Sequence, residues 1–346
     1  MKHSNLYDHI RLLAAALVLY SHHFALWGLP EPQGLGTSLG GLGVGIFFVL
    51  SGFLVSNSLQ ADPHALRFLM RRALRILPGL TVNVLLTVLV LGAALTTLPL
   101  RAYFEHEQVP QYFLNLLFQP RFQLPAVFVD ARVAYSVNGS LWTLPFEILA
   151  YLVLTALCLV PRLSMRVMAP LLLFISLVGM LAWHPAAPQD FWGNDLRKVP
   201  YFMALFFAGA TVSAYRQALL KPDLVIAALF CWAFFDAPAV RAVLSVLTLA
   251  LFFIYVGSRT VGPRWALKDD CSYGVYLYAY PVQQACIQLV PGWGFWPTMA
   301  LSAAITYGLA LLSWRLVERT ALKFKPRRAT ATTAAPIRSA AAAPVR

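Results

Sequence analysis

The stretch of residues 6–27 limits the possible folds more than any other part of this sequence. Its centre is an unbroken apolar and aromatic run, and a helix of about 20 such residues spans a bilayer. The same stretch carries Asp8, Arg11, His22 and His23. Ionisable side chains are costly inside a membrane and by default indicate function. We therefore expect a membrane helix that carries functional groups.

Three of these ionisable side chains are predicted to share one helix face. At about 100° per residue, His22 returns to within roughly 20° of Arg11, and Asp8 lies about 40° from His22. The helical rise places His22 about 16 Å beyond Arg11. His23 points elsewhere, so we expect its replacement by Ala to have little effect. The polar stripe is predicted to face the protein interior.

Composition indicates that most of the chain is embedded in the membrane. Hydrophobic residues make up 59% of the sequence and charged residues only 12%, whereas a soluble domain has about 25% charged residues. The sequence predicts an all-α integral membrane protein with a bundle of about ten transmembrane helices. The predicted spans are roughly 6–27, 42–59, 77–98, 140–160, 167–184, 199–215, 223–236, 240–257, 271–290 and 296–317.

The distribution of basic residues predicts the orientation of the bundle. With the N-terminus in the cytoplasm, most of the 27 Lys and Arg residues fall on the inner side, as the positive-inside rule requires. Both termini are therefore predicted to be cytoplasmic. The net charge of +13 is then mainly a topology signal, and we expect no nucleic-acid partner. The exceptions on the outer side are Arg101, Arg121, Arg132, Arg197, Lys198 and Arg241.

Two segments lie outside the predicted bundle. Residues 99–138 form the one long loop and are rich in Phe, Tyr, Gln and Pro, so we expect them to pack over the helices. Residues 326–346 are dominated by Ala, Thr, Pro and Arg and are predicted to form a disordered cytoplasmic tail. Residues 1–325 are then a single transmembrane domain.

An arginine cluster lies at the predicted cytoplasmic mouth of the third span. Arg71 and Arg75 share a helix face, and Arg72 lies almost on it. Guanidinium groups bind phosphate oxygens with two parallel hydrogen bonds. The cluster is therefore either a phosphate site or a topology determinant.

A second ionisable group is predicted inside the membrane at the fourth span. The segment NGSLWTLPFEI, residues 138–148, places Glu147 below the outer end of that span. A buried glutamate needs a partner. It either forms a structural ion pair with an arginine such as Arg11, or it orients or charges His22.

Together these segments resemble the membrane-bound acyltransferase-3 family. The resemblance begins with Asp8-x-x-Arg11 and a histidine eleven residues later, His22. It continues with FFVLSGFL at residues 47–54, Arg72-x-x-Arg75, the WTLPFE segment and SYGVYLYAYP in the ninth span, in the family's order. The sequence departs from the family pattern at Leu12, Gly45, Ile148 and Ala279, where the family has a glycine, an acid, a second glutamate and a histidine.

The resemblance implies a membrane O-acyltransferase that moves an acyl group, most often acetyl, from cytoplasmic acyl-CoA to an envelope glycan. The acceptor would be a hydroxyl of an exopolysaccharide, O-antigen or related glycolipid. It implies location in a bacterial inner membrane among its lipids, with acetyl-CoA or another acyl-CoA as donor substrate. We expect no permanently bound cofactor and no metal.

The resemblance also implies roles for individual residues. His22 would be the general base, since the pKa of histidine lies near neutrality, and Glu147 would support it. Arg71, Arg72 and Arg75, with Arg11 above them, would bind acyl-CoA. Acyl transfer also needs a donor to the developing oxyanion, for which the candidates are Ser51, Asn138 and Tyr151. The serine could instead be a helix-packing residue bonded to its own backbone.

Two other functions also fit a bundle of this composition. An intramembrane histidine and glutamate suit a proton-coupled transporter or a flippase, although such proteins usually contain two related halves, which this sequence does not show. A non-catalytic acyl-CoA sensor is the third possibility. Transfer of label from acetyl-CoA to a glycan distinguishes the enzyme from both.

Overall fold

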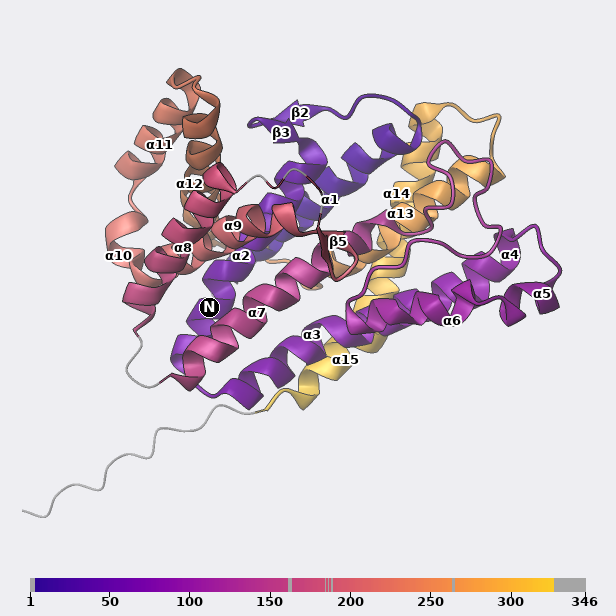
Figure 1. The fold of residues 1–346 in the computed structure, drawn as a ribbon, viewed down its shortest axis with the longest axis horizontal. Helices are drawn as coiled ribbons and strands as arrows, with labels where there is room; N and C mark the ends of the chain where they lie inside the picture. Colours follow the sequence, from indigo (N-terminus) through magenta and orange to yellow (C-terminus); the bar gives the residue numbers. More distant parts are fainter. Residues whose placement is uncertain are drawn as a thin grey trace, which may run out of the picture.

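The protein is a bundle of helices, seen in a computed structural model that describes residues 4–160, 164–183, 185, 187, 189–262 and 265–326 (Figure 1). The long helices are α1 (Tyr7–Leu26), α2 (Leu39–Ala61), α3 (Ala65–Leu86), α7 (Leu144–Leu159), α8 (Met165–Ala182), α9 (Val199–Ala214), α11 (Pro222–Phe234), α12 (Pro238–Gly257), α13 (Ser272–Leu289) and α14 (Phe295–Ser313). A π-helical turn at Thr87–Gly92 and α4 (Ala93–Leu95) extend α3. The predicted tail lies almost wholly outside the described residues.

A helix lies at each of the ten predicted spans, but not every helix is long and apolar enough to cross a membrane. Among the described residues, 6 candidate spans meet both conditions. Two of the others, α9 and α11, have only 16 and 13 residues. The structure thus confirms an all-α membrane fold, while the ten crossings and the side on which the termini lie stay predictions. The six are Leu39–Ala61, Ala65–Leu95, Gly139–Leu159, Met165–Ala182, Pro238–Gly257 and Phe295–Phe324.

Helix α2 lies at the centre of the bundle and packs against α1 and α9, while α9 also packs against α8. Close approach of α2 and α9 depends on two glycines. A Cβ atom on Gly52 would lie 1.9 Å from the Phe206 carbonyl oxygen, and one on Gly209 would lie 2.1 Å from the Val49 carbonyl oxygen. The glycine of the FFVLSGFL segment therefore has a packing role, because no larger residue fits there.

Helix α13 packs between α1 and α14, and the pair α11 and α12 lies at the edge of the bundle opposite α4 (Figure 1). The start of α1 is tied to the end of α12 by the short antiparallel pairing of β1 (Ser4–Asn5) with β6 (Thr260–Val261). Two small hairpins connect helices elsewhere: β2 (Gln33–Gly34) with β3 (Thr37–Ser38), and β4 (Asp190–Phe191) with β5 (Asn194–Asp195).

The long segment 99–138 packs onto the helices, as its aromatic composition predicted. It contains the short helices α5 (Leu100–Glu105) and α6 (Gln108–Tyr112). Tyr103 and Tyr112 are fully buried, and the Tyr103 hydroxyl donates to the Val88 carbonyl at 2.9 Å.

After α14 the chain continues through a π-helical turn (Trp314–Glu318), α15 (Arg319–Ala321) and a 3-10 turn, η7 (Leu322–Phe324). This last turn contacts α3. Because Arg11 and Lys325 line one cavity, the first and last described helices meet at the same end of the bundle. This end of the bundle is called the N-terminal end of α1 below.

Candidate functional site

A cavity of about 320 Å³ opens among α1, α2, α3, α7 and α13 near the N-terminal end of α1. Much of its wall is apolar, including side chains of the FFVLSGFL segment of α2. A limited set of polar groups converges on it, as is typical of ligand sites. The polar and charged lining residues are Arg11, Ser51, Arg72, Arg75, Thr143, Glu147, Tyr151, Asp270, Tyr273, Tyr276 and Lys325.

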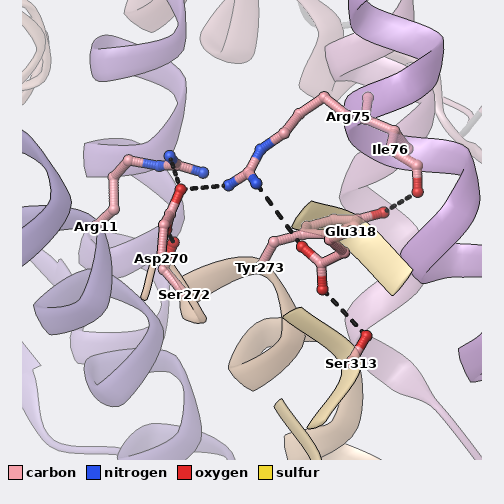
Figure 2. A network of polar contacts seen from close by, with 8 residues as sticks. All are labelled: Arg11, Arg75, Ile76, Asp270, Ser272, Tyr273, Ser313 and Glu318. Carbon is pink, nitrogen blue, oxygen red and sulfur yellow. Dashed lines mark hydrogen bonds and ion pairs between the residues drawn. The ribbon is translucent and has the colours of Figure 1, made fainter. Parts of the chain in front are cut away.

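Asp270, just before α13, joins two arginines of this cavity (Figure 2). Its Oδ2 accepts from Arg11 and from Arg75, each at 2.7 Å. Its Oδ1 accepts from the Ser272 hydroxyl at 2.7 Å. Burial would raise the pKa of Asp270, but the two guanidinium groups outweigh it and lower this pKa to about 2. The carboxylate is therefore ionised at any physiological pH and links α1, α3 and α13.

Arg75 has further partners on its other side. Glu318 lies 3.7 Å from its guanidinium and accepts from Ser313 at 3.1 Å (Figure 2). The guanidinium also lies 5.9 Å from the centre of the Tyr273 ring and 5.5 Å from that of Trp314. Arg75 is thus held firmly, and much of its charge is already balanced.

Arg71, which the sequence grouped with the phosphate-binding arginines, is placed differently from its two neighbours. It does not line the cavity. It is buried and ion-paired with Asp62, which also accepts two hydrogen bonds from Arg67, at 3.0 and 2.6 Å. Hydrogen bonds from both arginines hold the pKa of Asp62 well below its usual range. This cluster fixes the α2–α3 turn, a structural role.

Arg72 and Lys325 are the two cavity cations that lack an acidic partner within the described part of the chain. The Arg72 Nε is buried and makes no hydrogen bond to any described residue. A buried donor without a partner is costly. The combination indicates a site that accepts an anion.

Ser51, Tyr151 and Glu147 form a hydrogen-bonded group on the cavity wall. Tyr151, one turn after Glu147 in α7, donates to the Glu147 Oε1. The Ser51 hydroxyl, from α2, lies 3.0 Å from the Tyr151 hydroxyl and donates to the same Glu147 oxygen at 3.4 Å. Glu147 therefore has hydroxyl partners and forms no ion pair with Arg11, whose carboxylate partner is Asp270. Two of the three candidate oxyanion donors lie together in the cavity.

Asn138, the third candidate, is engaged elsewhere. Its side-chain amide donates to Asn83 at 3.2 Å and to the Leu277 carbonyl at 3.0 Å, while its oxygen caps the helical turn that follows, accepting from the Ser140 amide. The residue is fully buried and does not line the cavity. Its hydrogen bonds tie α3, α7 and α13 together, so it is a structural residue.

His22 lies beyond the cavity, in α1. It is half-buried, and its ring meets the Tyr280 ring edge-on with centroids 5.3 Å apart. Its Nδ1 is buried and has no hydrogen-bond partner in the described ranges, nor does the structure join it to Glu147. Tyr280 is one turn along α13 from Tyr276, which lines the cavity. The cavity wall thus ends about 6 Å along α13 from the residue that touches His22.

His23 has a different environment and a different role. It is fully buried. Its Nε2 lies 3.0 Å from the Phe295 carbonyl oxygen and 3.3 Å from the Thr298 hydroxyl. His23 thus ties the end of α1 to the start of α14. Because of this contact we now expect its replacement to affect folding, although it lies away from the cavity.

Sequence reasoning missed Asp270, Glu318 and Lys325. Asp269 and Asp270 stand next to each other before the ninth span, on a side where almost all other charges are basic. That acidic pair was an available signal for ion-pair partners. No comparable signal singles out Lys325. Lys323 lies two residues away and both lysines are exposed, but only Lys325 lines the cavity.

Apolar helices around a cavity lined by ionisable groups define an integral membrane protein with a polar internal site. The sequence matches the acyltransferase domain family over residues 5–315, so the chain belongs to this family. The O-acetyl transferase of Shigella phage Sf6 is 32% identical over 326 residues, covering 92% of this chain and 96% of the relative. Nodulation protein 10 of Rhizobium leguminosarum bv. viciae is 29% identical over 353 residues, covering 93% and 94%.

No solved structure matches this chain. The family and the O-acetyl transferase relative together support a membrane O-acyltransferase.

Proposed function

We propose that the protein transfers an acyl group, in the first place acetyl, from cytoplasmic acyl-CoA to a hydroxyl of an exopolysaccharide, O-antigen or other envelope glycan. The proposal places the protein in the bacterial inner membrane with the N-terminal end of α1 facing the cytoplasm. The observation that carries it is the cavity, whose lining includes hydroxyl groups and two cations that have no acidic partner among the described residues. The name of the phage relative supports acetyl as the group transferred.

The donor would enter from the mouth of the cavity. Arg72, and Arg75 by rearrangement of its ion pairs, would hold the CoA phosphates, since guanidinium groups suit phosphate oxygens. The apolar wall formed by Phe47, Phe48 and Leu54 would surround the pantetheine arm. The thioester would then point towards Tyr276 and the histidine beyond it.

His22 would act on the acceptor as general base. Its Nδ1, which has no hydrogen-bond partner among the residues described, would take the proton of the acceptor hydroxyl as the oxygen attacks the thioester carbonyl. Collapse of the tetrahedral intermediate breaks the carbon–sulfur bond and releases the CoA thiolate, which receives the proton. The reacting groups would meet between the cavity wall and His22. The wall ends at Tyr276, about 6 Å along α13 from Tyr280, whose ring contacts His22.

Ser51, Tyr151 and Glu147 would act at the donor end of the same path. The hydroxyls of Ser51 and Tyr151 are the candidate donors to the developing oxyanion. Before the reaction, Glu147 holds both hydroxyls by accepting their hydrogen bonds. Each hydroxyl has one proton, which would turn from Glu147 to the oxyanion as the charge develops. This gives Glu147 a role through Tyr151 in place of the predicted contact with His22.

Transfer of radioactive label from acetyl-CoA tests the proposal. Purified protein in detergent is incubated with labelled acetyl-CoA and a panel of envelope glycans. Covalently labelled glycan is expected. Binding of acetyl-CoA without labelling of any hydroxyl-bearing acceptor would contradict an acyltransferase, and uptake of a glycan into vesicles without label would identify a transporter.

A further inference from the structure

The charges around the cavity do not balance. Two carboxylates and four cations line it. Asp270 is shared by Arg11 and Arg75, and Glu147 is bonded to hydroxyl groups. This leaves Arg72 and Lys325 as two positive charges without an acid among the residues that the structure describes.

Lys325 is brought to the cavity by the way its segment is attached to α3. The turn η7 contacts α3, and both Leu322 and Lys325 line the cavity. The Arg71 Nε donates to the Pro326 carbonyl at 3.4 Å, while the other end of that guanidinium is ion-paired with Asp62. Arg71 therefore links the α2–α3 turn to the residue next to Lys325.

We propose that Lys325 is a donor-binding residue and forms, with Arg72, the site for a phosphate group of the acyl-CoA. This inference rests on the proposed function and adds a residue and a location to it. Two cations that line one cavity suit the doubly charged phosphate groups of a nucleotide. Arg71 is a positioning residue, because it acts through the backbone that carries Lys325.

The same arrangement makes donor binding dependent on pH. Lys325 is exposed at the edge of the cavity. Partial desolvation by the surrounding protein, then repulsion from Arg72, Arg75, Arg71 and Arg11, lower its pKa to about 8. An anion bound beside Lys325 favours the charged ammonium and raises that pKa again. Binding near pH 8 therefore takes up roughly half a proton. As the pH rises above 8, the free protein loses this charge, so donor affinity falls.

Asp270 and the arginines of the cavity do not change this direction. Asp270 is held ionised by two arginines, and the arginines stay charged throughout this range. The remaining ionisable groups that line the cavity or lie beside its arginines are Glu147, Tyr151, Tyr273, Tyr276 and Glu318.

Calorimetric titration of acetyl-CoA, without acceptor, into the full chain in neutral, lipid-free detergent tests the proposal. Lys325→Gln is expected to weaken binding at pH 7 at least tenfold, as loss of a charge-assisted contact does. Lys323→Gln is the matched control and should bind like the wild type. The wild type should bind more weakly at pH 9 than at pH 7, whereas Lys325→Arg should lose little affinity, since arginine stays charged.

The possible results separate this inference from the proposed function. If the wild type binds no acetyl-CoA, the proposed function fails and the inference falls with it. If the wild type binds and Lys325→Gln binds equally tightly, the proposed function stands but Lys325 is not a donor ligand. A thermal unfolding curve of Lys325→Gln that matches the wild type confirms that the fold is intact.

Discussion

Replacing Asp270 by Asn should loosen the bundle while strengthening its hold on an anion. The change keeps the size of the side chain but removes the charge that bridges Arg11 and Arg75, each 2.7 Å away. The side chains of Arg11, Asp270 and Arg75 are only 21%, 15% and 14% exposed, respectively. Without Asp270, two neighbouring guanidinium groups lose their shared counterion.

The structure sets the size of the effect. Removing one partner of a buried ion pair costs about 3–5 kcal/mol. The lower end, about 3 kcal/mol, applies because Arg75 keeps Glu318 at 3.7 Å and the site is not fully closed to water. The same loss frees both arginines for phosphate oxygens, so acetyl-CoA should bind more tightly and restore part of the lost stability.

Thermal unfolding of the purified protein, with and without acetyl-CoA, measures both effects. Asp269→Asn is the matched control, because Asp269 pairs with an arginine that is 60% exposed and such surface pairs contribute little. Asp270→Asn should unfold several degrees lower than this control and should gain more from acetyl-CoA than the wild type does. If both variants unfold alike and gain equally, Asp270 does not hold the arginines in the way described.

Three further changes test packing and orientation. Gly52→Ala should cost at least about 3 kcal/mol of stability in thermal unfolding, because its Cβ would meet the Phe206 carbonyl; Gly308→Ala, where a Cβ meets nothing within 4 Å, should be tolerated. His23→Ala should lower the yield of folded protein by gel filtration, since it leaves a cavity and removes the hydrogen bond that ties α1 to α14. A phosphatase reporter should be active near Gln108 and inactive at the C-terminus, and the opposite pattern would reverse the proposed orientation.

The sequence predicted the helices well because their signal is local. Apolar runs bounded by polar residues gave a helix at all ten predicted positions. Local patterns do not determine how many helices cross the membrane. Short helices such as α11 are apolar enough for a membrane but are not long enough to span it. Similarly, the role of Gly52 depends on a carbonyl of α9, which no pattern within α2 can indicate.

The candidate site was predictable in residue type but not in pairing. Arg11, Arg72 and Glu147 do lie around one cavity, as ionisable groups in apolar segments suggested. Their partners come from distant parts of the chain: Asp270 is 259 residues from Arg11. Helix periodicity gives the direction of a side chain but does not identify its partner, so Arg71 was grouped with its neighbours although it pairs with Asp62.

The turnover of His22→Ala, in transfer of labelled acetyl groups to an envelope glycan, tests the central claim most directly. Loss of a general base should lower turnover by about 10²–10⁴-fold. Affinity for acetyl-CoA should stay near the wild-type value, because His22 lies outside the cavity that would hold the donor. A His22→Ala protein that transfers acetyl groups at a near-normal rate would contradict the account.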